Sequence, residues 1–356
     1  MISAAMRRTI KSSILHVNDR SSTSMIKAVV FGSSSQIARA AIGLLTNIHA
    51  QVLIPCRTSS KWVDYLRIGN FKFISFRQQL DLKDPDILDQ VLENANVVIN
   101  TIGGYHYIRD YDTLYESNVT VPRRIAEACA RNPDILRLIH FSAVGIDPAS
   151  TSPRLQTKWH GEQEVKAAYP NVTILRPTTI FGEYDNYVTR MGLIQQMIDY
   201  LPVIDDAKEL RQPIYYKDIG QCVINCLRMP ETIGKTYELG GPNVYSNREI
   251  MEIVYNKIGK PPNVRSIPYR KAHKFIQYMP HTFGFSRHMS LNDVEESQMD
   301  IVVSKDALKI EDLKVKPVSF PQNLMRILQD YQAKVDLTMD EALHGWYGGH
   351  DRTYEP

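Results

Sequence analysis

Short apolar runs alternate with helical patterns along the first half of this chain, and the alternation restricts its fold more than any other feature. Each run has the length and the β-branched content of a buried strand, and the segments between runs place apolar residues on one helical face. Because this alternation is typical of βαβ units, we predict an α/β fold: a Rossmann-like, doubly wound parallel sheet with helices on both faces. The expected strands are 27–31, 51–55, 71–76, 96–101, 136–141 and 172–175, and the expected helices include 35–48, 85–94 and 111–130.

The alternation weakens beyond roughly residue 183, where proline-bearing loops interrupt the pattern. These loops contain Gln212-Pro213, Gly241-Pro242 and Pro261-Pro262. We therefore expect a smaller mixed α/β lobe that covers the carboxyl edge of the sheet, where α/β folds bind ligands. The predicted parts of the chain are 1–22, a presequence or N-terminal extension; 23–183, the sheet domain; 184–335, the smaller lobe; and 336–356, a C-terminal arm.

The N-terminal segment is basic and lacks acidic residues from Met1 to Asn18. Arg7, Arg8 and Lys11 are accompanied by serine and threonine, and apolar residues gather loosely on one side of a helix. This composition is typical of a mitochondrial transit peptide, which is amphipathic, rich in arginine and serine and poor in acids. A disordered basic tail is the alternative interpretation.

Composition excludes several other classes of protein. The net charge of +3 is small and dispersed, which argues against nucleic-acid binding. No run of about 18 apolar residues predicts a membrane-spanning helix. The four cysteines do not suggest a disulfide framework in a chain this long and indicate a reducing compartment. Cys222 and Cys226 lie one helical turn apart, but no further Cys or His pair lies near them in sequence, so we predict core packing rather than a metal site.

The junction after the first predicted strand has the form of a phosphate-binding turn. Gly32 occupies the first glycine position of a G-x-x-G-x-x-G pattern, and Ser35 and Ala38 replace the other two glycines. Both replacements are small, so a pyrophosphate can still approach the helix N-terminus. A helix simply capped by serine is the alternative, but the place of this turn inside a βαβ series favours nucleotide binding. The residues expected at the phosphates are Gly32, Ser34, Ser35, Gln36 and Ile37.

The end of the second predicted strand indicates which dinucleotide binds. An NAD site would place Asp or Glu there, as an acceptor for the ribose hydroxyls. This chain has Cys56-Arg57, and its next acid is Asp64. Because a guanidinium pairs with a 2′-phosphate through bidentate hydrogen bonds, Arg57 favours NADP(H) over NAD(H). A solvated surface arginine is the alternative.

These motifs resemble those of the extended or atypical short-chain dehydrogenase/reductase family, and within it the nucleotide-binding accessory subunits of mitochondrial respiratory complex I. The less generic matches are Ile54-Pro55-Cys56-Arg57 and Gln212-Pro213-Ile214-Tyr215. The resemblance covers about residues 25 to 245, and the rest of the chain carries no motif that we can place. The segments that carry it are 31–38, 51–57, 96–103, 138–142, 158–162, 175–182 and 212–218.

The resemblance implies further contacts to the cofactor. Asp81 and Leu82 would flank the adenine, and Ser142 and Lys158 match the catalytic serine and lysine of the family. The loop after the fourth strand would line the dinucleotide cleft, and the segment after the strand at 172–175 would lie near the nicotinamide. Those two groups are Thr101, Ile102 and Gly103, and Pro177, Thr178, Thr179 and Ile180.

The family's proton donor is missing from this chain. Hydride transfer to a carbonyl uses a tyrosine four residues before the lysine, and one helical turn places both side chains on one face. The residue four before Lys158 is Arg154, which stays protonated and cannot act as a general acid. None of the 19 tyrosines has a lysine four residues later. We therefore predict that the chain is not an enzyme and binds NADP(H), as NADPH, without turnover, for a structural or redox-sensing purpose.

The resemblance to complex I subunits implies the partners and the location. It predicts an accessory subunit on the matrix side of the mitochondrial inner membrane, bound to other subunits of complex I and associated with the membrane only through them. It predicts support for the assembly or stability of the matrix arm, and no metal and no nucleic acid. The C-terminal residues 336–356 include Trp346 and Tyr347, which suggest an arm that docks on a partner; a tail packed on its own domain is the alternative.

Three rival functions remain at this point. An active NADP-dependent reductase or epimerase would need another proton donor, such as Tyr184, Tyr187 or His160. A scaffold that has also lost the cofactor is suggested by the two missing glycines, although Arg57 argues against it. Nucleic-acid binding by a related fold lacks a basic stripe or stacking aromatics in the sequence.

Overall fold

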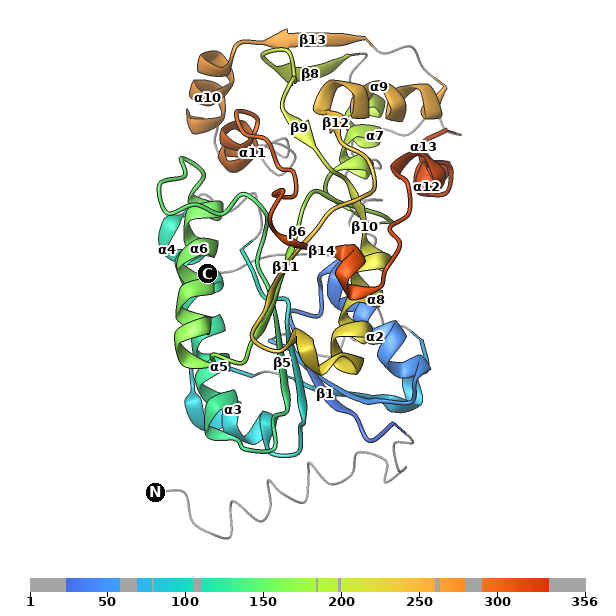
Figure 1. Ribbon diagram of the computed structural model, residues 1–356. Helices are drawn as coiled ribbons and strands as arrows, with labels where there is room; N and C mark the ends of the chain where they lie inside the picture. The colour runs from blue at the N-terminus through green and yellow to red at the C-terminus, as the bar shows by residue number, and fades with distance from the viewer. Residues whose placement is uncertain are drawn as a thin grey trace.

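The main sheet has eight parallel strands. A computed structural model describes residues 24–57, 69–78, 80–104, 110–183, 185–197, 200–259, 263–278 and 290–332. The strand order is β14-β11-β6-β5-β4-β1-β2-β3 (Figure 1). The chain order reverses between β1 and β4, which makes that point the topological switch of a doubly wound sheet. The strands are β1 (Lys27–Phe31), β2 (Gln51–Pro55), β3 (Ile74–Arg77), β4 (Val97–Asn100), β5 (Arg137–Phe141), β6 (Thr173–Pro177), β11 (Thr236–Leu239) and β14 (Leu308–Lys309).

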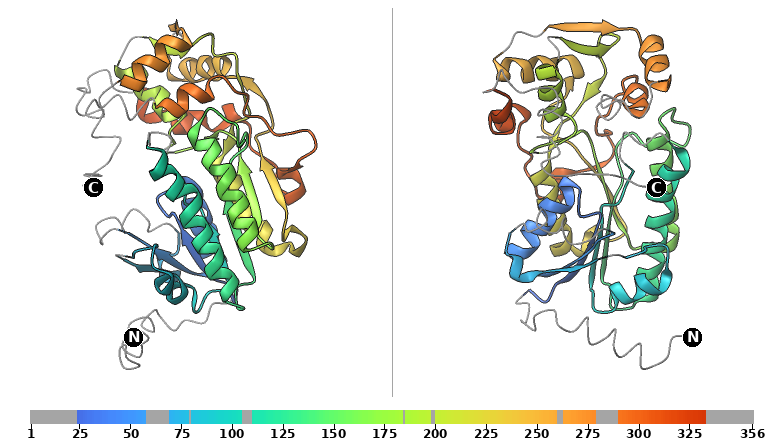
Figure 2. Two further views of the ribbon diagram at one scale, coloured as in Figure 1. Left: turned by 90° about the vertical axis from the view of Figure 1, so that its left-hand side faces the viewer. Right: turned by 180° about the vertical axis from the view of Figure 1, so that it is seen from behind.

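Helices cover both faces of this sheet, as predicted. On one face, α2 (Gln36–Asn47) and α8 (Tyr216–Arg228) bury their apolar sides against the strands. On the other face lie α3 (Pro85–Leu92), α5 (Val121–Arg131) and α6 (Pro153–Ala168). Figure 2 shows this second layer from the side, as the cyan and green helices. The strands are buried on both faces, which explains their continuous apolar sequences.

The predicted cysteine packing is confirmed. Cys222 and Cys226 lie on α8 and are fully buried in the core between that helix and the sheet. Within the described ranges, no group of three or more His, Cys, Asp or Glu side chains is arranged to hold a metal. No helix of the described residues has the length and apolarity needed to cross a membrane.

Two predicted elements differ in detail. The expected strand 71–76 begins as a 3₁₀ turn, η3 (Phe71–Phe73), and only then becomes β3. The expected helix 111–130 is divided into α4 (Tyr111–Tyr115), a π-helical segment η4 (Glu116–Thr120) and α5. The π segment packs directly against α6. The carbonyl oxygen of Asn118 approaches Gly161 so closely that a Cβ there would lie only 1.8 Å away. This contact between two helices cannot be predicted from the sequence of either helix alone.

A second lobe sits at the carboxyl edge of the sheet and has its own apolar core. It pairs β8 (Leu201–Ile204) with β13 (Val264–Ile267), β9 (Leu210–Arg211) with β12 (Tyr245–Ser246), and β7 (Ile180–Phe181) with β10 (Ile214–Tyr215). Its helices are α7 (Val188–Met197), α9 (Asn247–Ile258), α10 (Tyr269–Tyr278), α11 (Leu291–Glu296) and α12 (Phe320–Ile327). Although they follow residue 183, α8, β11 and β14 return to the main sheet.

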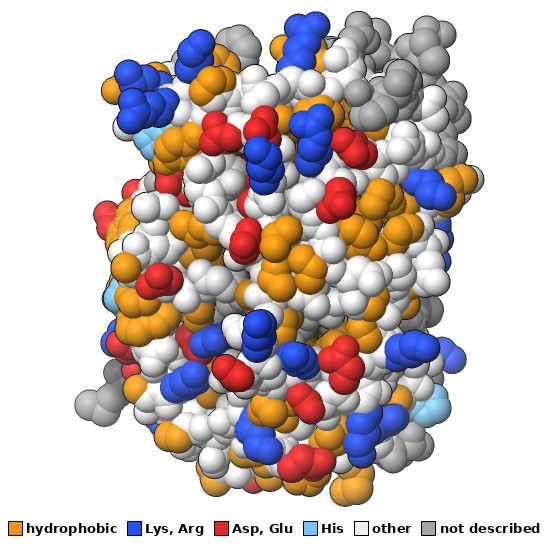
Figure 3. All heavy atoms as spheres, turned by 45° about the horizontal axis from the view of Figure 1, so that its top comes forward, with side chains coloured by type: hydrophobic (Ala, Val, Ile, Leu, Met, Phe, Trp, Pro, Cys, Tyr) orange, Lys and Arg blue, Asp and Glu red, His pale blue; other side chains and the backbone are white. Residues whose placement is uncertain are grey.

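On the face shown in Figure 3, basic and acidic side chains are interspersed. The predicted presequence 1–22, the arm 336–356 and Tyr184 lie outside the described residues.

Candidate nucleotide-binding site

The turn after β1 requires glycine at its first position. Gly32 has φ +79°, and a Cβ there would lie 2.7 Å from both Ile102 N and Thr101 Oγ1. Phe31 and Asn100 are paired at the ends of β1 and β4, so the two loops that follow lie side by side. The close approach of the loops therefore allows no side chain at position 32. The turn lies at the switch point of the sheet, where α/β folds bind ligands.

Ser35 and Thr101 join these two loops. The Ser35 side chain caps α2 by accepting a hydrogen bond from Ala38 N at 3.0 Å. Its hydroxyl donates to Thr101 Oγ1 at 3.0 Å, and Thr101 Oγ1 lies 2.9 Å from the carbonyl oxygens of Phe31 and Gly32. The structure thus brings together two residues that were expected separately at the phosphates and in the cleft. They hold the N-terminus of α2 facing the edge where a pyrophosphate would bind.

Lys158 lies against the cleft loop. A Cβ on Gly103 would be 3.0 Å from Lys158 Nζ, so the ammonium on α6 reaches the loop after β4. Burial, reinforced by the positive charge of Arg154, lowers the pKa of Lys158 to about 8. A bound anionic dinucleotide would favour the charged form and offset part of this cost.

Two buried polar atoms of the predicted site have no hydrogen-bond partner within the described part of the protein. They are Ser142 Oγ, after β5, and Gln36 Oε1, at the first turn of α2. Buried polar atoms are almost always satisfied in native proteins, and an orphaned pair at one sheet edge indicates a missing ligand. Together with the glycine turn, these two atoms fit a dinucleotide along the carboxyl edge.

Three polar residues that the sequence analysis missed support the cleft loop. Asn118, in η4, accepts a hydrogen bond from Gly104 N at 2.7 Å and donates to Thr157 Oγ1 at 2.8 Å. Asn100 accepts from Ile102 N at 3.0 Å and its amide lies 3.2 Å from His140 Nδ1. Burial lowers the pKa of His140 to about 3, so the ring is neutral and Nδ1 accepts from the amide. No residue pattern in the sequence pointed to these three, because their contacts depend on how the elements pack.

The residues expected at the adenosine end are near one another. Arg57 follows β2 and is exposed to solvent. Leu80 N donates to Cys56 O at 3.2 Å, which brings the 80–82 segment to the end of β2. The carboxylate of Asp81 accepts from Lys83 N, and Leu82 packs on the core behind the sheet. Arg57 is therefore placed at the rim with its guanidinium open to solvent, where a 2′-phosphate could pair with it.

Two of the four residues expected near the nicotinamide form hydrogen bonds within the protein. Pro177 is the last residue of β6, and its carbonyl accepts from Val144 N at 3.0 Å. Thr178 is buried, and its hydroxyl lies 2.5 Å from Gln212 O and 3.2 Å from Leu239 O. Thr179 and Ile180 are half-buried. Among these four residues, Thr178 uses its hydroxyl to tie β6 to β11 and to the second lobe.

Arg154, at the position of the family's tyrosine, is paired with the second lobe. Its guanidinium forms a bidentate ion pair with Glu296, with Nε and one terminal nitrogen each 2.8 Å from a carboxylate oxygen. The guanidinium is therefore held by Glu296 and supplies no proton at the place of the family's tyrosine, while its charge acts on Lys158. Of the substitute donors considered, Tyr187 donates to Asn247 Oδ1 at 2.5 Å inside the second lobe, and burial raises its pKa. His160 is half-buried on α6 beside Trp159.

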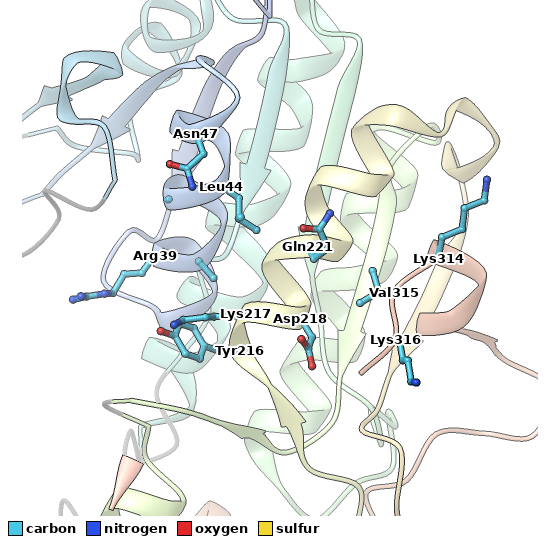
Figure 4. A pocket seen from close by; sticks show the side chains of 12 residues that line it. Arg39, Leu44, Asn47, Tyr216, Lys217, Asp218, Gln221, Lys314, Val315 and Lys316 are labelled. Carbon is cyan, nitrogen blue, oxygen red and sulfur yellow. The ribbon is translucent and has the colours of Figure 1, made fainter. Parts of the chain in front are cut away.

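A separate groove of about 530 Å³ lies between α2, α8 and residues 314–316 (Figure 4). Arg39 and Lys217 lie toward one side of it, and Lys314 and Lys316 toward the other. None of the residues predicted to contact the cofactor lines this groove. It is thus distinct from the residues predicted to contact the cofactor at the carboxyl edge.

The parallel sheet, the glycine turn at its switch point and the lysine on the helix after β5 together form a Rossmann-like architecture. The chain belongs to the family described as RmlD substrate binding domain, whose model matches residues 26–277. A solved structure of dTDP-glucose 4,6-dehydratase from Streptomyces venezuelae with bound NAD superposes with a TM-score of 0.66. That structure is 18% identical and covers 86% of this chain and 97% of its own, which shows the shared fold.

Curated relatives extend over most of the chain. One is "NADH dehydrogenase [ubiquinone] 1 alpha subcomplex subunit 9, mitochondrial" of Arabidopsis thaliana, 29% identical over 306 residues, covering 84% of this chain and 76% of the relative. Another is the mitochondrial "NADH-ubiquinone oxidoreductase 40 kDa subunit" of Neurospora crassa, 29% identical over 334 residues, covering 92% and 85%. A dTDP-4-dehydrorhamnose reductase of Mycobacterium tuberculosis is 25% identical over 207 residues, covering 52% and 66%.

Proposed function

We propose that this protein is a non-catalytic accessory subunit of mitochondrial complex I that binds NADP(H) as a structural component. It would lie on the matrix side of the inner membrane, contact other subunits of the complex and stabilise the matrix arm. The support is the relatedness of at least 84% of the chain to proteins named as mitochondrial complex I subunits. The acid-free N-terminal segment agrees with import into mitochondria.

The observation that carries the proposal is the contrast between Lys158 and Arg154. A nucleotide-holding lysine faces the cleft loop, while the residue one turn earlier is engaged with the other lobe. NADPH supplies a hydride when bound, but reduction of a carbonyl also needs a positioned proton donor. Loss of such a donor typically lowers the rate by about 10² to 10⁴.

A cofactor that is not turned over still stabilises the protein. A ligand at about 100 times its dissociation constant adds about 2.7 kcal/mol to the free energy of unfolding. This is a substantial part of the roughly 5 to 15 kcal/mol that separates folded from unfolded domains. NADP(H) selection over NAD(H) rests on the exposed Arg57 at the end of β2.

The test is to identify the nucleotide that the protein carries. The full chain, or its parent complex, is denatured anaerobically and the released nucleotide is identified by mass spectrometry. We expect NADP(H) near one molecule per chain, and no steady oxidation of NADPH with carbonyl or sugar-nucleotide substrates. Release of NAD(H) would contradict the Arg57 argument, and absence of any nucleotide would overturn the cofactor proposal.

The second candidate is an active NADP-dependent reductase or epimerase. It is favoured by the retained Ser142 and Lys158 and by the similarity to a dTDP-4-dehydrorhamnose reductase. Steady NADPH oxidation in the same assay, abolished by Lys158→Met, would establish it in place of the accessory role.

A further inference from the structure

Arg154 and Glu296 connect the two lobes of the protein. Arg154 lies in the first turn of α6, on the sheet domain, and Glu296 is the last residue of α11, in the second lobe. Both hydrogen bonds of the pair measure 2.8 Å, and the two side chains are only 19% and 15% exposed. A bidentate pair shielded from water in this way is stronger and more specific in direction than a surface ion pair.

The joint around this pair is buried and hydrogen-bonded on both sides. Ser152, which caps α6, has no exposed surface and donates to Glu296 Oε1 at 3.1 Å. Asn292, which is 2% exposed, accepts at Oδ1 from Arg154 N at 3.2 Å. The start of α6 therefore contacts α11 through three groups: the Ser152 hydroxyl, the backbone N–H of Arg154 and the guanidinium of Arg154.

α11 is in turn anchored inside the second lobe. Arg190 on α7 forms an ion pair with Asp293 at 3.0 Å, and Tyr269 on α10 donates to Glu295 at 2.9 Å. Arg211 on β9 donates to the carbonyl oxygens of Glu296 and Met299 at 2.7 and 2.5 Å. Because α11 is held to three elements of its own lobe, α11 and the second lobe move together. The Arg154–Glu296 pair therefore connects the whole lobe to α6.

The same helix carries the residue at the cleft. Lys158 is one turn after Arg154 on α6, so the contact to α11 and the contact to the cleft loop are made by adjacent turns. Opening the cleft by moving the second lobe away from α6 would break the Arg154–Glu296 pair. It would also break the hydrogen bonds that Ser152 Oγ and Arg154 N donate to Glu296 and Asn292 on α11.

We propose that the Arg154–Glu296 pair is a latch between the lobes that keeps the cleft closed over bound nucleotide and makes the nucleotide exchange slowly. The latch residue Arg154 occupies the position at which the family has its proton-donating tyrosine. The proposal rests on the proposed binding of NADP(H), and it identifies Arg154 and Glu296 as positioning residues rather than contacts of the nucleotide.

The experiment measures how fast nucleotide leaves the full-length protein. The protein is loaded with NADPH and mixed with a large excess of NADP⁺, and the loss of protein-bound NADPH fluorescence gives the dissociation rate. We expect Glu296→Gln to accelerate dissociation about ten-fold or more, since the remaining charge on Arg154 favours the open, hydrated state. The charge-swapped double variant Arg154→Glu/Glu296→Arg is expected to return the rate to within about three-fold of the wild type.

The matched control is Arg190→Gln. It breaks the ion pair between Arg190 on α7 and Asp293 on α11, at 15% and 23% exposure, whose partners both belong to the second lobe. It keeps the Asp293 carboxylate, whose charge also acts on Arg154, and it keeps the Arg154–Glu296 pair. We expect it to lower thermal stability while changing the dissociation rate by less than about two-fold. A general loss of stability would accelerate dissociation in both variants, whereas loss of the latch accelerates it only in Glu296→Gln.

Each outcome decides between the proposals. Equal dissociation rates for wild type and Glu296→Gln would overturn the latch and leave NADP(H) binding intact. A wild type that binds no NADPH would overturn the cofactor proposal, and the latch with it. If Glu296→Gln does not fold, the charge-swapped variant decides: slow dissociation supports the latch, and rapid dissociation from a folded swapped protein overturns it.

Discussion

Two regions of the molecule are built from different interactions. One is the edge of the sheet around Gly32, Ser35 and Thr101, called here the phosphate-side edge, and the other is the joint between α6 and α11. The first uses a glycine backbone, small hydroxyls and a helix cap, with Ser35 and Thr101 66 residues apart. The second uses a charged pair whose partners are 142 residues apart and belong to different lobes. The first region has the residue pattern that we propose to hold a dinucleotide, and the second occupies the position where the family has its tyrosine. Under the proposed function, the two regions separate binding from chemistry.

The largest effect should come from removing the glycine at the phosphate-side edge. Gly32→Ala places a side chain at φ +79° and against Ile102 and Thr101, so we expect the free energy of unfolding to fall by about 3 kcal/mol or more, with loss of NADPH binding. Gly145→Ala is the matched control, because Gly145 has φ +80° with nothing within 4 Å of the added carbon. It should lose only about 1 to 2 kcal/mol in the same denaturant titration. Equal losses would show that crowding at position 32 is unimportant.

Restoring the family's tyrosine at the joint should not restore chemistry. Arg154→Tyr removes the ion pair and leaves Glu296 with the hydrogen bond from Ser152, and we expect a loss of about 3 kcal/mol in the free energy of unfolding. We expect no NADPH oxidation, because position 154 lies at the contact with α11. Arg154→Gln is the control for loss of the ion pair alone. Turnover that appears with tyrosine and not with glutamine would mean that the joint can still serve as a catalytic centre.

Specificity at the phosphate-side edge should depend on one exposed arginine. Arg57→Gln is expected to weaken NADPH binding about 30-fold, or about 2 kcal/mol, because a charge-assisted contact to the 2′-phosphate is lost. NADH has no such phosphate, so its affinity should not change. Lys27→Gln, at the opposite end of β1, removes a positive charge away from the carboxyl edge and serves as the control. Both affinities can be measured by titration with fluorescence quenching. If Arg57→Gln leaves the preference for NADPH over NADH unchanged, the assignment of Arg57 is wrong.

The smallest effect concerns Lys158, between the two regions. Its pKa of about 8 in the folded protein lies below the ordinary value of 10.5, so the unfolded chain binds the extra proton between these values. The stability of the nucleotide-free protein should therefore rise with pH from about 8 to 10.5. Lys158→Met should remove this slope and stabilise the nucleotide-free protein at pH 7 by roughly 1 kcal/mol, while weakening NADPH binding. An unchanged slope in Lys158→Met, measured by denaturation across this pH range, would assign the titration to another group.

Most strands were predictable because their information is local. The predicted runs at 27–31 and 51–55 coincide with β1 and β2, since each carries its own apolar pattern and ends at a glycine or proline. The prediction was less accurate where another element decides the conformation. Phe71–Phe73 forms a 3₁₀ turn, and the helix beginning at Tyr111 adopts a π segment where it meets Gly161.

The predicted site divides in the same way. Gly32, Ser35 and Thr101 could be singled out because they follow strands in a known pattern, and the structure places them in contact. Asn118 could not be found from the sequence, because its contacts with Gly104 and Thr157 depend on how η4 packs across α6. Thr178 was expected near the nicotinamide, and its hydroxyl bonds to the carbonyl oxygens of Leu239 at the end of β11 and of Gln212 in the loop before β10.

The sequence alone determined the class of fold, the glycine turn, the arginine after β2 and the absence of a tyrosine four residues before Lys158. These features depend on local backbone preferences and on residue identity at short, regular spacing. Only the tertiary structure decided what Arg154 does. A guanidinium on the first turn of a helix has no preferred direction until a carboxylate 142 residues away is brought beside it, and the packing of the second lobe supplies that partner.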